Sequence, residues 1–203
     1  HPPLWVACTQ METFELAGQK GIGALCFTIG NPGELRSRIE AYRAAVEHPA
    51  EPVGKKVNEQ VAAFTIAYCD ENRGRGREIG GQAGAWYFQH SRMRHSNDWA
   101  GVDKALVPED YQYHLRREEF ETQRRKDADP EELIDNGSFC AGDPDGCIEI
   151  AERYEALGVD QLLPIFQTAN IPHDKVMNSI RLFGKHVIPY FQKKDRDAAG
   201  VVC

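Results

Sequence analysis

The stretch GDPDGCIEIAERYEALGVDQLLPIF, residues 142–166, decides the fold. Asp143-Pro144 is typical of a helix start, because proline is tolerated at the first helical position. The helix is predicted to run through Leu157 and to stop at Gly158. The apolar segment Asp160–Phe166 that follows predicts a buried strand. A helix that leads directly into such a strand is the repeating unit of α/β proteins with parallel sheets.

The same alternation of strand and helix recurs upstream and once downstream. Four strands that alternate with helices predict a parallel sheet with right-handed crossovers. A complete eight-stranded barrel takes about 250 residues, so a chain of 203 residues is a small open sheet or half of a barrel. The other predicted strands are Leu4–Cys8, Ala24–Ile29 and Asn58–Tyr68, and the other predicted helices are 9–20, 31–47, 75–90 and 173–191.

Composition narrows the possible partners and locations. The net charge of −7 argues against nucleic acid or an anionic membrane as a partner. No apolar run reaches the roughly 18 to 20 residues that a membrane span needs. The six cysteines show no CxxC spacing, which predicts buried thiols rather than a metal site or a disulfide framework. We expect a cytoplasmic location, since no signal peptide is visible. A strand beginning at Leu4 without an initiator Met predicts an excised segment.

Residues 91–138 are too long and too polar for an ordinary connector, which in α/β units has about 2 to 6 residues. Trp99, Tyr111, Tyr113 and Phe120 are spaced along this insertion, and its part 112–126 is predicted to be helical. Long loops tend to be functional, so one interpretation is a mobile lid over a substrate. The alternative is a surface or dimer-contact insertion.

Two regions carry a resemblance to a known family. The segment HPPLWVA (1–7), continuing to Thr9 and Glu12, resembles the segment that opens the fifth strand of bacterial-luciferase-like flavin-dependent monooxygenases. The second region is similar to the family's last helix, last strand and closing helix, and comprises Gly142–Asp145, Tyr154–Gln161, Ile171–Ile180 and His186–Pro189. The resemblance covers residues 1–90 and 138–192, and leaves 91–137 unmatched.

The resemblance implies an α/β fold that is the C-terminal half, strands five to eight, of a luciferase-like (β/α)8 TIM barrel. Residues 1–203 would form one half-barrel domain with a mostly helical insertion or lid at 91–138. Strands one to four, which carry much of the family's flavin and substrate contact, are absent. Catalytic residues are therefore expected outside this chain, and the isolated fragment is expected to be inactive.

The implied activity is that of a monooxygenase that uses reduced FMN and O2 to oxygenate a small organic substrate. Such enzymes usually receive reduced FMN from a separate flavin reductase, and a homo-oligomer is expected. One alternative is an oxidoreductase of the same superfamily that uses the deazaflavin F420 for hydride transfer. A different class of alternative is a non-catalytic flavoprotein or partner subunit.

Four residues are candidates for contact with the cofactor. The helix predicted to begin at Thr9 offers free backbone amides to an anion. The resemblance implies that this turn, with Cys8 and Thr9, helps to hold the FMN phosphate through the Thr9 hydroxyl. It also places Phe27 and Thr28 near the isoalloxazine ring. The alternatives are that Thr9 caps its helix in a capping box with Glu12, and that Phe27 packs in the core. No metal site is predicted, since no zinc-ligand spacing is present.

Overall fold

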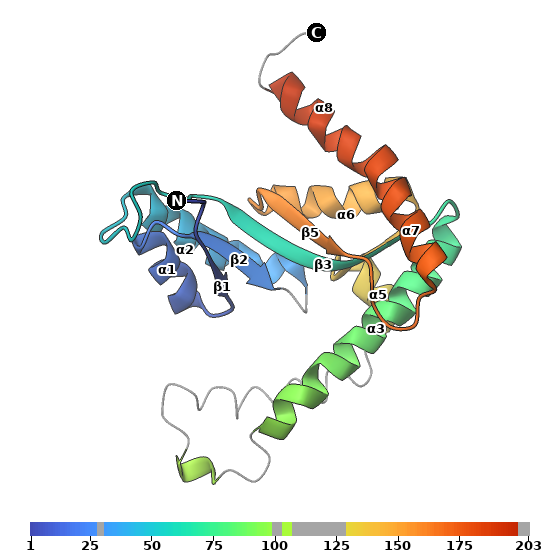
Figure 1. Ribbon diagram of the computed structural model, residues 1–203, viewed down its shortest axis with the longest axis horizontal. Helices are drawn as coiled ribbons and strands as arrows, with labels where there is room; N and C mark the ends of the chain where they lie inside the picture. Colours follow the sequence, from blue (N-terminus) through green and yellow to red (C-terminus); the bar gives the residue numbers. More distant parts are fainter. Residues whose placement is uncertain (28–30, 99–102, 107–128, 199–203) are drawn as a thin grey trace.

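The computed structural model of the chain describes residues 1–27, 31–98, 103–106 and 129–198 (Figure 1). Its centre is a sheet in which every pair of neighbouring strands is parallel, as predicted. The strands are β1 (Trp5–Cys8), β2 (Gly23–Phe27), β3 (Val61–Cys69), β4 (Phe139–Gly142) and β5 (Gln161–Ile165). The helices are α1 (Met11–Gln19), η1 (Pro32–Leu35), α2 (Arg36–Glu47), α3 (Arg73–Asp98), η2 (Lys104–Leu106), α5 (Pro130–Asp135), α6 (Pro144–Ala156), α7 (His173–Leu182), the π-helical turn η4 (Phe183–Val187) and α8 (Ile188–Ala198).

Strand β3 organises the sheet because all but one of the other strands pair with it. Its first half pairs with β2 on one side and with β5 on the other, while β1 pairs with β2. Its second half pairs with β4. Ile66 is paired with both Phe139 and Ile165, so β4 lies on the β2 side of β3 and continues that side beyond the end of β2. The sequence prediction of four strands missed β4.

Two predicted helix starts differ from those in the structure. The capping box at Thr9 is wrong: α1 begins at Met11, its N-cap is Gln10, and no side chain caps it. The helix predicted from residue 75 begins at Arg73 and continues to Asp98, so α3 contains the first eight residues of the predicted insertion. The start of α6 is confirmed, because the Asp143 side chain accepts a hydrogen bond from the Gly146 N–H at 2.9 Å.

The predicted insertion is only partly described. Its last part contains α5, whose first turn is capped by the Asp129 carboxylate through the Glu131 N–H. The predicted helix 112–126 lies outside the described residues, as do Trp99, Tyr111, Tyr113 and Phe120. Figure 1 shows the far ends of α3 and α8 pointing away from the sheet. None of the helices in the described part of the chain combines the length and apolar character that crossing a membrane requires.

Glycines bring α3 against β4. Gly76, Gly80 and Gly84 are four residues apart and therefore share one helix face. A Cβ atom at Gly76 would lie 2.2 Å from the Gly142 carbonyl oxygen, and one at Gly80 would lie 2.5 Å from the Ala141 Cβ. The absence of side chains at these positions allows the backbone of α3 to approach the short strand closely.

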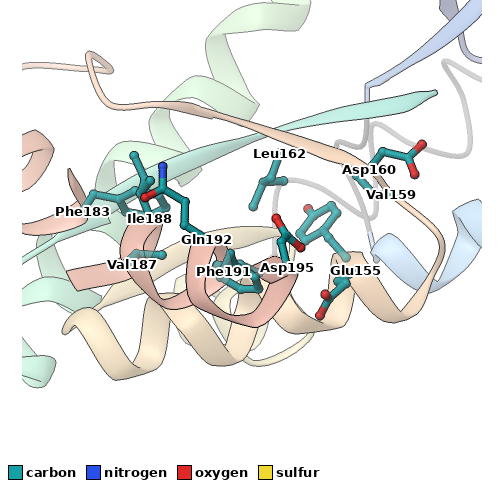
Figure 2. Close-up of a pocket in the computed structure, with 12 residues that line it drawn as sticks. Glu155, Val159, Asp160, Leu162, Phe183, Val187, Ile188, Phe191, Gln192 and Asp195 are labelled. Carbon is teal, nitrogen blue, oxygen red and sulfur yellow. The ribbon is translucent and has the colours of Figure 1, made fainter. Parts of the chain in front are cut away.

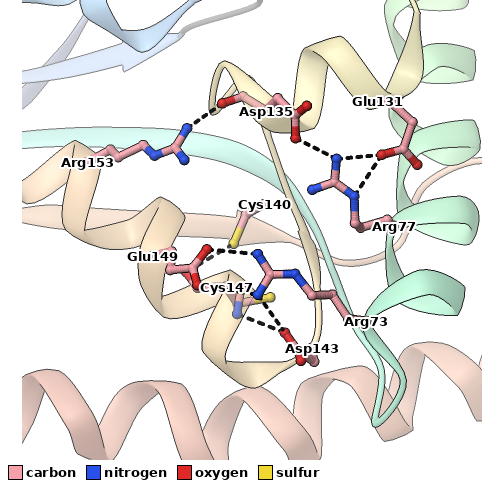
Figure 3. A network of polar contacts seen from close by, with 10 residues as sticks. Arg73, Arg77, Glu131, Asp135, Cys140, Asp143, Cys147, Glu149 and Arg153 are labelled. Carbon is pink, nitrogen blue, oxygen red and sulfur yellow. Dashed lines mark hydrogen bonds and ion pairs between the residues drawn. The ribbon is translucent and has the colours of Figure 1, made fainter.

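A network of ion pairs lies at the surface beside the contact between α3 and β4 (Figure 3). Arg73 of α3 pairs with Glu149 of α6 at 2.9 Å. Arg77, one turn later, pairs with Glu131 and Asp135 of α5 at 2.5 and 2.6 Å. The two arginines therefore join α3 to the helices that precede and follow β4. Most of these side chains are exposed, so the network fixes geometry more than it adds stability.

The two faces of the sheet differ in their cover. Side chains alternate between the faces along each strand, and the register places Cys8, Cys26 and Ala63 in one row. All three are buried, in one core cluster with residues of α1 and α2 such as Phe14 and Tyr42. We call this the helix-covered face. On the other face, which we call the open face, Ala62 and Ile66 of β3 are buried, but the remaining apolar side chains are exposed or half-buried: Trp5, Ala7, Leu25, Phe64, Leu163 and Ile165.

Candidate functional site

Parallel strands end at the same edge of a sheet, and ligands of such folds bind at that edge. Here β1 ends at Cys8 and β2 ends at Phe27. The register pairs Cys8 with Cys26, so Thr9 and Phe27, the next residue along each strand, follow the same row. The structure therefore brings two of the predicted cofactor residues to neighbouring strand ends. Thr28 lies outside the described residues, as does the Phe27 side chain.

The Cys8 side chain points away from this edge. It is 1% exposed, and its Sγ lies 3.7 Å from the Thr13 carbonyl oxygen of α1. Burial raises the pKa of Cys8 to about 11. Burial and the neighbouring Cys8 raise the pKa of Cys26 to about 12. Both thiols are therefore protonated near neutral pH, and only the backbone of Cys8 is placed to meet a ligand at the strand end.

Thr9 is exposed and does not cap α1. The first turn of α1 closes instead through the Gln10 carbonyl, which accepts from the Thr13 N–H at 3.1 Å. The Thr9 hydroxyl is thus not used by the helix cap, and it lies next to a helix N-terminus, whose dipole favours anions. Glu12 in the same turn adds a negative charge, which opposes an anion there.

The open face adds an apolar surface beside this turn. Phe64 is half-buried and shares a row with Leu163, which is 43% exposed, and with the backbone of Phe27. Leu25 lies on the same face, two residues before Phe27 along β2. Small-molecule sites combine a mostly apolar lining with a few polar groups that fix orientation, and this surface supplies the apolar part. The edge and the open face together make the candidate site.

One buried carboxylate follows β3 and was not predicted as functional. Asp70 accepts hydrogen bonds from Arg75 Nε and from the Asn72 N–H, both at 2.9 Å. Burial alone would raise its pKa, but the hydrogen bonds from Arg75 and Asn72 outweigh burial and hold the pKa of Asp70 below its usual value. The sequence does contain a signal for this buried carboxylate, namely a charged residue directly after the apolar run of β3. Its partners give Asp70 a role in anchoring the start of α3.

The segment after β5 holds an unusual pair of residues. Thr168 is buried, and among the described residues its Oγ1 is the one buried side-chain oxygen or nitrogen without a hydrogen-bond partner. Ala169 has a φ of 50°, a left-handed conformation that costs energy for residues other than glycine. The sequence contains no signal for either feature.

A groove of about 250 Å³ lies at the opposite end of β5 (Figure 2). Its apolar lining includes Leu162, Phe183 and Phe191, from β5, η4 and α8. Glu155 and Asp160 also line it, but Glu155 is paired with Lys194, and Asp160 lies 2.6 Å from Arg43. The groove is near the beginning of β5, away from the strand ends that form the candidate site. In the described ranges, no three His, Cys, Asp or Glu side chains are grouped to hold a metal.

Comparison with known proteins agrees with this architecture. Residues 1–161 match the sequence profile of a family that is described as luciferase-like monooxygenase. The match includes the insertion that the resemblance left unplaced, and it ends before the segments Ile171–Ile180 and His186–Pro189 that the resemblance included. No curated protein sequence matches the chain.

Several solved structures share the fold at low identity. The monooxygenase RslO1 from Streptomyces bottropensis is 16% identical with a TM-score of 0.60, over 94% of this chain and 49% of that one. The oxygenating constituent of 3,6-diketocamphane monooxygenase from a Pseudomonas putida plasmid, in complex with FMN, is 19% identical with a TM-score of 0.61, over 93% and 49%. The coenzyme F420-dependent tetrahydromethanopterin reductase from Methanopyrus kandleri is 22% identical with a TM-score of 0.56, over 93% and 51%.

This chain therefore spans about half the length of the solved structures it matches. At these identities the likeness concerns the fold, an α/β arrangement around a parallel sheet. The sequence profile covers well over half of the chain and confirms the resemblance found in the sequence. The chain belongs to the luciferase-like monooxygenase family.

Proposed function

We propose that this chain is the C-terminal half of a luciferase-like barrel which, once completed, is a flavin-dependent monooxygenase. The observation that carries the proposal is the open apolar face between β1 and β5, the two edge strands of the described part of the sheet, with the Thr9 turn at its carboxyl end. In a completed barrel this face would be interior, and its carboxyl end would be the ligand-binding end. Strands β1, β2, β3 and β5 would be strands five to eight, and β4 an addition to β3.

The proposed cofactor is reduced FMN, delivered by a separate flavin reductase. Thr9 would donate a hydrogen bond to the phosphate, with the backbone of Cys8 beside it. Phe27 and Thr28 would lie near the isoalloxazine ring. The bound flavin would supply the reaction with O2, while Leu25, Phe64 and Leu163 would keep water from the ring and help to shape the pocket for a small organic substrate.

Two alternative functions are compared with the monooxygenase. A structural neighbour is a coenzyme F420-dependent reductase, and the apolar open face would suit a deazaflavin as well as FMN. A non-catalytic flavoprotein or partner subunit is the other alternative, because no residue of this half is assigned to catalysis. Consumption of O2 and reduced FMN with incorporation of oxygen into a substrate would favour the monooxygenase. Hydride transfer to or from F420 without O2 would favour the first alternative.

The experiment that tests the site is Thr9→Ala in a protein that contains both halves of the barrel. Loss of a hydrogen bond to a charged phosphate should weaken FMN binding by about 1–2 kcal/mol. Riboflavin, which lacks the phosphate, should lose much less. Ser37→Ala, at an exposed position of α2, is the matched control and should change neither affinity. Equal losses for FMN and riboflavin would rule out a phosphate contact by Thr9.

The isolated 203-residue chain should bind FMN weakly, because half of the pocket is missing. Isothermal titration is expected to give no sub-micromolar complex. The proposed domain is a single half-barrel over residues 1–203, with the insertion at 91–138 beside the substrate side. Tight FMN binding by this chain alone would show that its own strand ends suffice, and the half-site proposal would be wrong.

A further inference from the structure

The groove at the beginning of β5 lies where the last long helix changes its hydrogen-bond pattern. The chain passes from α7 through the π-helical turn η4 into α8, whose far end points away from the sheet (Figure 1). Phe183 and Val187, the first and last residues of this turn, line the groove together with Phe191 of α8. A π-helical turn within a helix is rare and often marks a functional site. Here the turn supplies an apolar wall of the groove between α6 and α8.

The groove belongs to the helix layer and not to the open face. Leu162 of β5 lines the groove, whereas Leu163 lies on the open face. Because side chains alternate along a strand, Leu162 faces the helices. Strands that complete the barrel would cover the open face and leave this helix-side groove as it is. An inference about the groove therefore does not depend on the proposed flavin chemistry.

The polar part of the lining is acidic. Carboxylates of Glu155, Asp160 and Asp195 line the groove, and no Lys, Arg or His is among the described residues that do so. Two of these carboxylates have cationic partners, since Glu155 pairs with Lys194 and Asp160 pairs with Arg43. Asp195, which points from α8 toward the groove (Figure 2), has no ion pair within the described part of the chain. One negative charge at the groove is thus without a counter-ion.

The aromatic rings of the groove also favour a cation. The Lys194 ammonium lies 6.0 Å from the centre of the Phe191 ring, and the face of an aromatic ring attracts positive charge. Phe183 and Tyr154 add two further rings to the lining. The volume of about 250 Å³ is below the roughly 300–1,000 Å³ of sites for drug-sized ligands. The groove therefore suits a small molecule and is too small for a helix or a folded partner.

We propose that this groove binds a small organic cation, an ammonium group on an apolar body. The apolar body contacts Leu162, Phe183 and Phe191, and the ammonium group pairs with the Asp195 carboxylate. A neutral ligand of the same shape would gain the apolar contacts without the charge-assisted hydrogen bond to Asp195. An anionic ligand would meet three carboxylates and no lining cation. Charge complementarity thus selects the ammonium.

NMR titration of the 203-residue chain tests the site with two probes of equal size. Phenethylamine is a cation at neutral pH, and phenethyl alcohol replaces its ammonium group by a hydroxyl. Phenethylamine should cause saturable shift changes at Val187, Phe191 and Asp195, with a dissociation constant at least about tenfold below that of the alcohol. No saturable binding, equal constants for the two probes, or shifts spread over the whole acidic surface would overturn the proposal.

Two aspartates of α8 separate a specific site from attraction by the net charge of −7. Asp195→Asn should raise the dissociation constant of phenethylamine about tenfold and leave that of phenethyl alcohol unchanged. Asp197→Asn, at an exposed position of the same helix outside the lining, is the matched control and should change neither constant. Ile188→Ser, at a lining residue that is 47% exposed, should weaken both probes. Equal effects of the two aspartate variants would show that the amine senses only the overall charge, and the proposed site would be wrong.

Discussion

The helix-covered face and the open face are made by the same strands, yet they impose different requirements on the sequence. On the covered face Cys8, Cys26, Ala63 and Thr65 are almost completely buried. On the open face their neighbours along the chain, such as Ala7, Leu25 and Phe64, remain exposed or half-buried. The difference shows that the described chain packs one face of its sheet into a hydrophobic core and leaves apolar side chains of the other face partly exposed to solvent.

The core on the helix-covered face is closely packed. Tyr42 is fully buried in this core, and its polar group still has hydrogen-bond partners. The Tyr42 hydroxyl donates to the Asn58 carbonyl at 2.9 Å, and the Ile22 carbonyl lies 3.1 Å away. Its buried environment raises the pKa of Tyr42 to about 12, so it stays a neutral donor. Among the described residues of the open face, the side-chain hydrogen bond from Gln161 Nε2 to Gln60 Oε1, at 2.7 Å, is exposed to solvent. The main hydrophobic core thus lies on the covered face, and the candidate site lies on the open face and its carboxyl edge.

The largest expected contrast between the two faces comes from truncating one apolar side chain on each. Phe14→Ala in α1 removes a fully buried ring and should lower the free energy of unfolding by about 3–5 kcal/mol. Leu163→Ala on the open face should cost about 1 kcal/mol or less, since the side chain is already partly solvated. Urea unfolding measures both. Similar losses would mean that the open face is packed within one chain.

A second contrast uses two glycines. A Cβ atom at Gly18 would lie 2.6 Å from the Ala45 Cβ and 2.8 Å from the Tyr42 carbonyl oxygen, whereas nothing lies within 4 Å of one at Gly184. Gly18→Ala should therefore separate α1 from α2 and destabilise the chain by about 1–3 kcal/mol. Gly184→Ala should be neutral or stabilise by up to about 1 kcal/mol, because alanine favours helix. Thermal unfolding midpoints that move in the same direction would contradict the close α1–α2 packing.

The fold class could be predicted because its signals are local. The helix start at Asp143 and the stop at Gly158, which has a φ of 91°, have the predicted roles. Strand β4 was missed because a four-residue strand has no periodicity to detect. Its place depends on long-range contact with β3 and on the glycines of α3.

The candidate site was predicted less completely, for a physical reason. Thr9 and Phe27 were selected as strand ends, and the structure places them in neighbouring strands. The capping box failed because the chain takes two more residues, Thr9 and Gln10, before α1 begins. Alternation along β1 shows which residues share a face with Cys8. To predict that Cys8 points toward α1, one must also know which face of the sheet the helices cover. That choice is made by packing and not by the strand itself.

The carboxyl end of β3 provides a smaller, pH-dependent effect. The pKa of Asp70 is lowered in the folded chain, chiefly by Arg75 acting against burial. A lowered folded-state pKa contributes stability above the unfolded value, near 4 for aspartate, and that stability is lost as pH falls through the folded pKa. Asp70→Asn should cost about 1 kcal/mol near pH 7, and less as pH falls below about 4. Unfolding midpoints of both proteins between acid and neutral pH measure this. A difference that does not shrink in acid would exclude the charged pair as its cause.

The last contrast compares two buried threonines, for which we expect effects of opposite sign. Thr65, on the covered face, donates from its Oγ1 to the Ser138 carbonyl at 3.1 Å. Thr168, after β5, is buried with no partner for its Oγ1. A buried hydroxyl without a partner keeps its desolvation cost, and a satisfied one regains it through the hydrogen bond. The same change, threonine to valine, should therefore move stability in opposite directions at the two positions.

Thr168→Val should stabilise the chain by about 1 kcal/mol, because it removes an unpaired buried hydroxyl while keeping the shape of the side chain. Thr65→Val, the matched control, should destabilise it by about 1 kcal/mol, since the Ser138 carbonyl loses its donor. Urea midpoints with unchanged slopes would show that both changes act on the folded state. If Thr168→Val destabilises the chain as well, the hydroxyl is satisfied in solution by a bound water, and the end of β5 is more hydrated than its burial indicates. If it stabilises the chain, the carboxyl end of β5 carries a local cost beside the left-handed Ala169, at the edge where the candidate site lies.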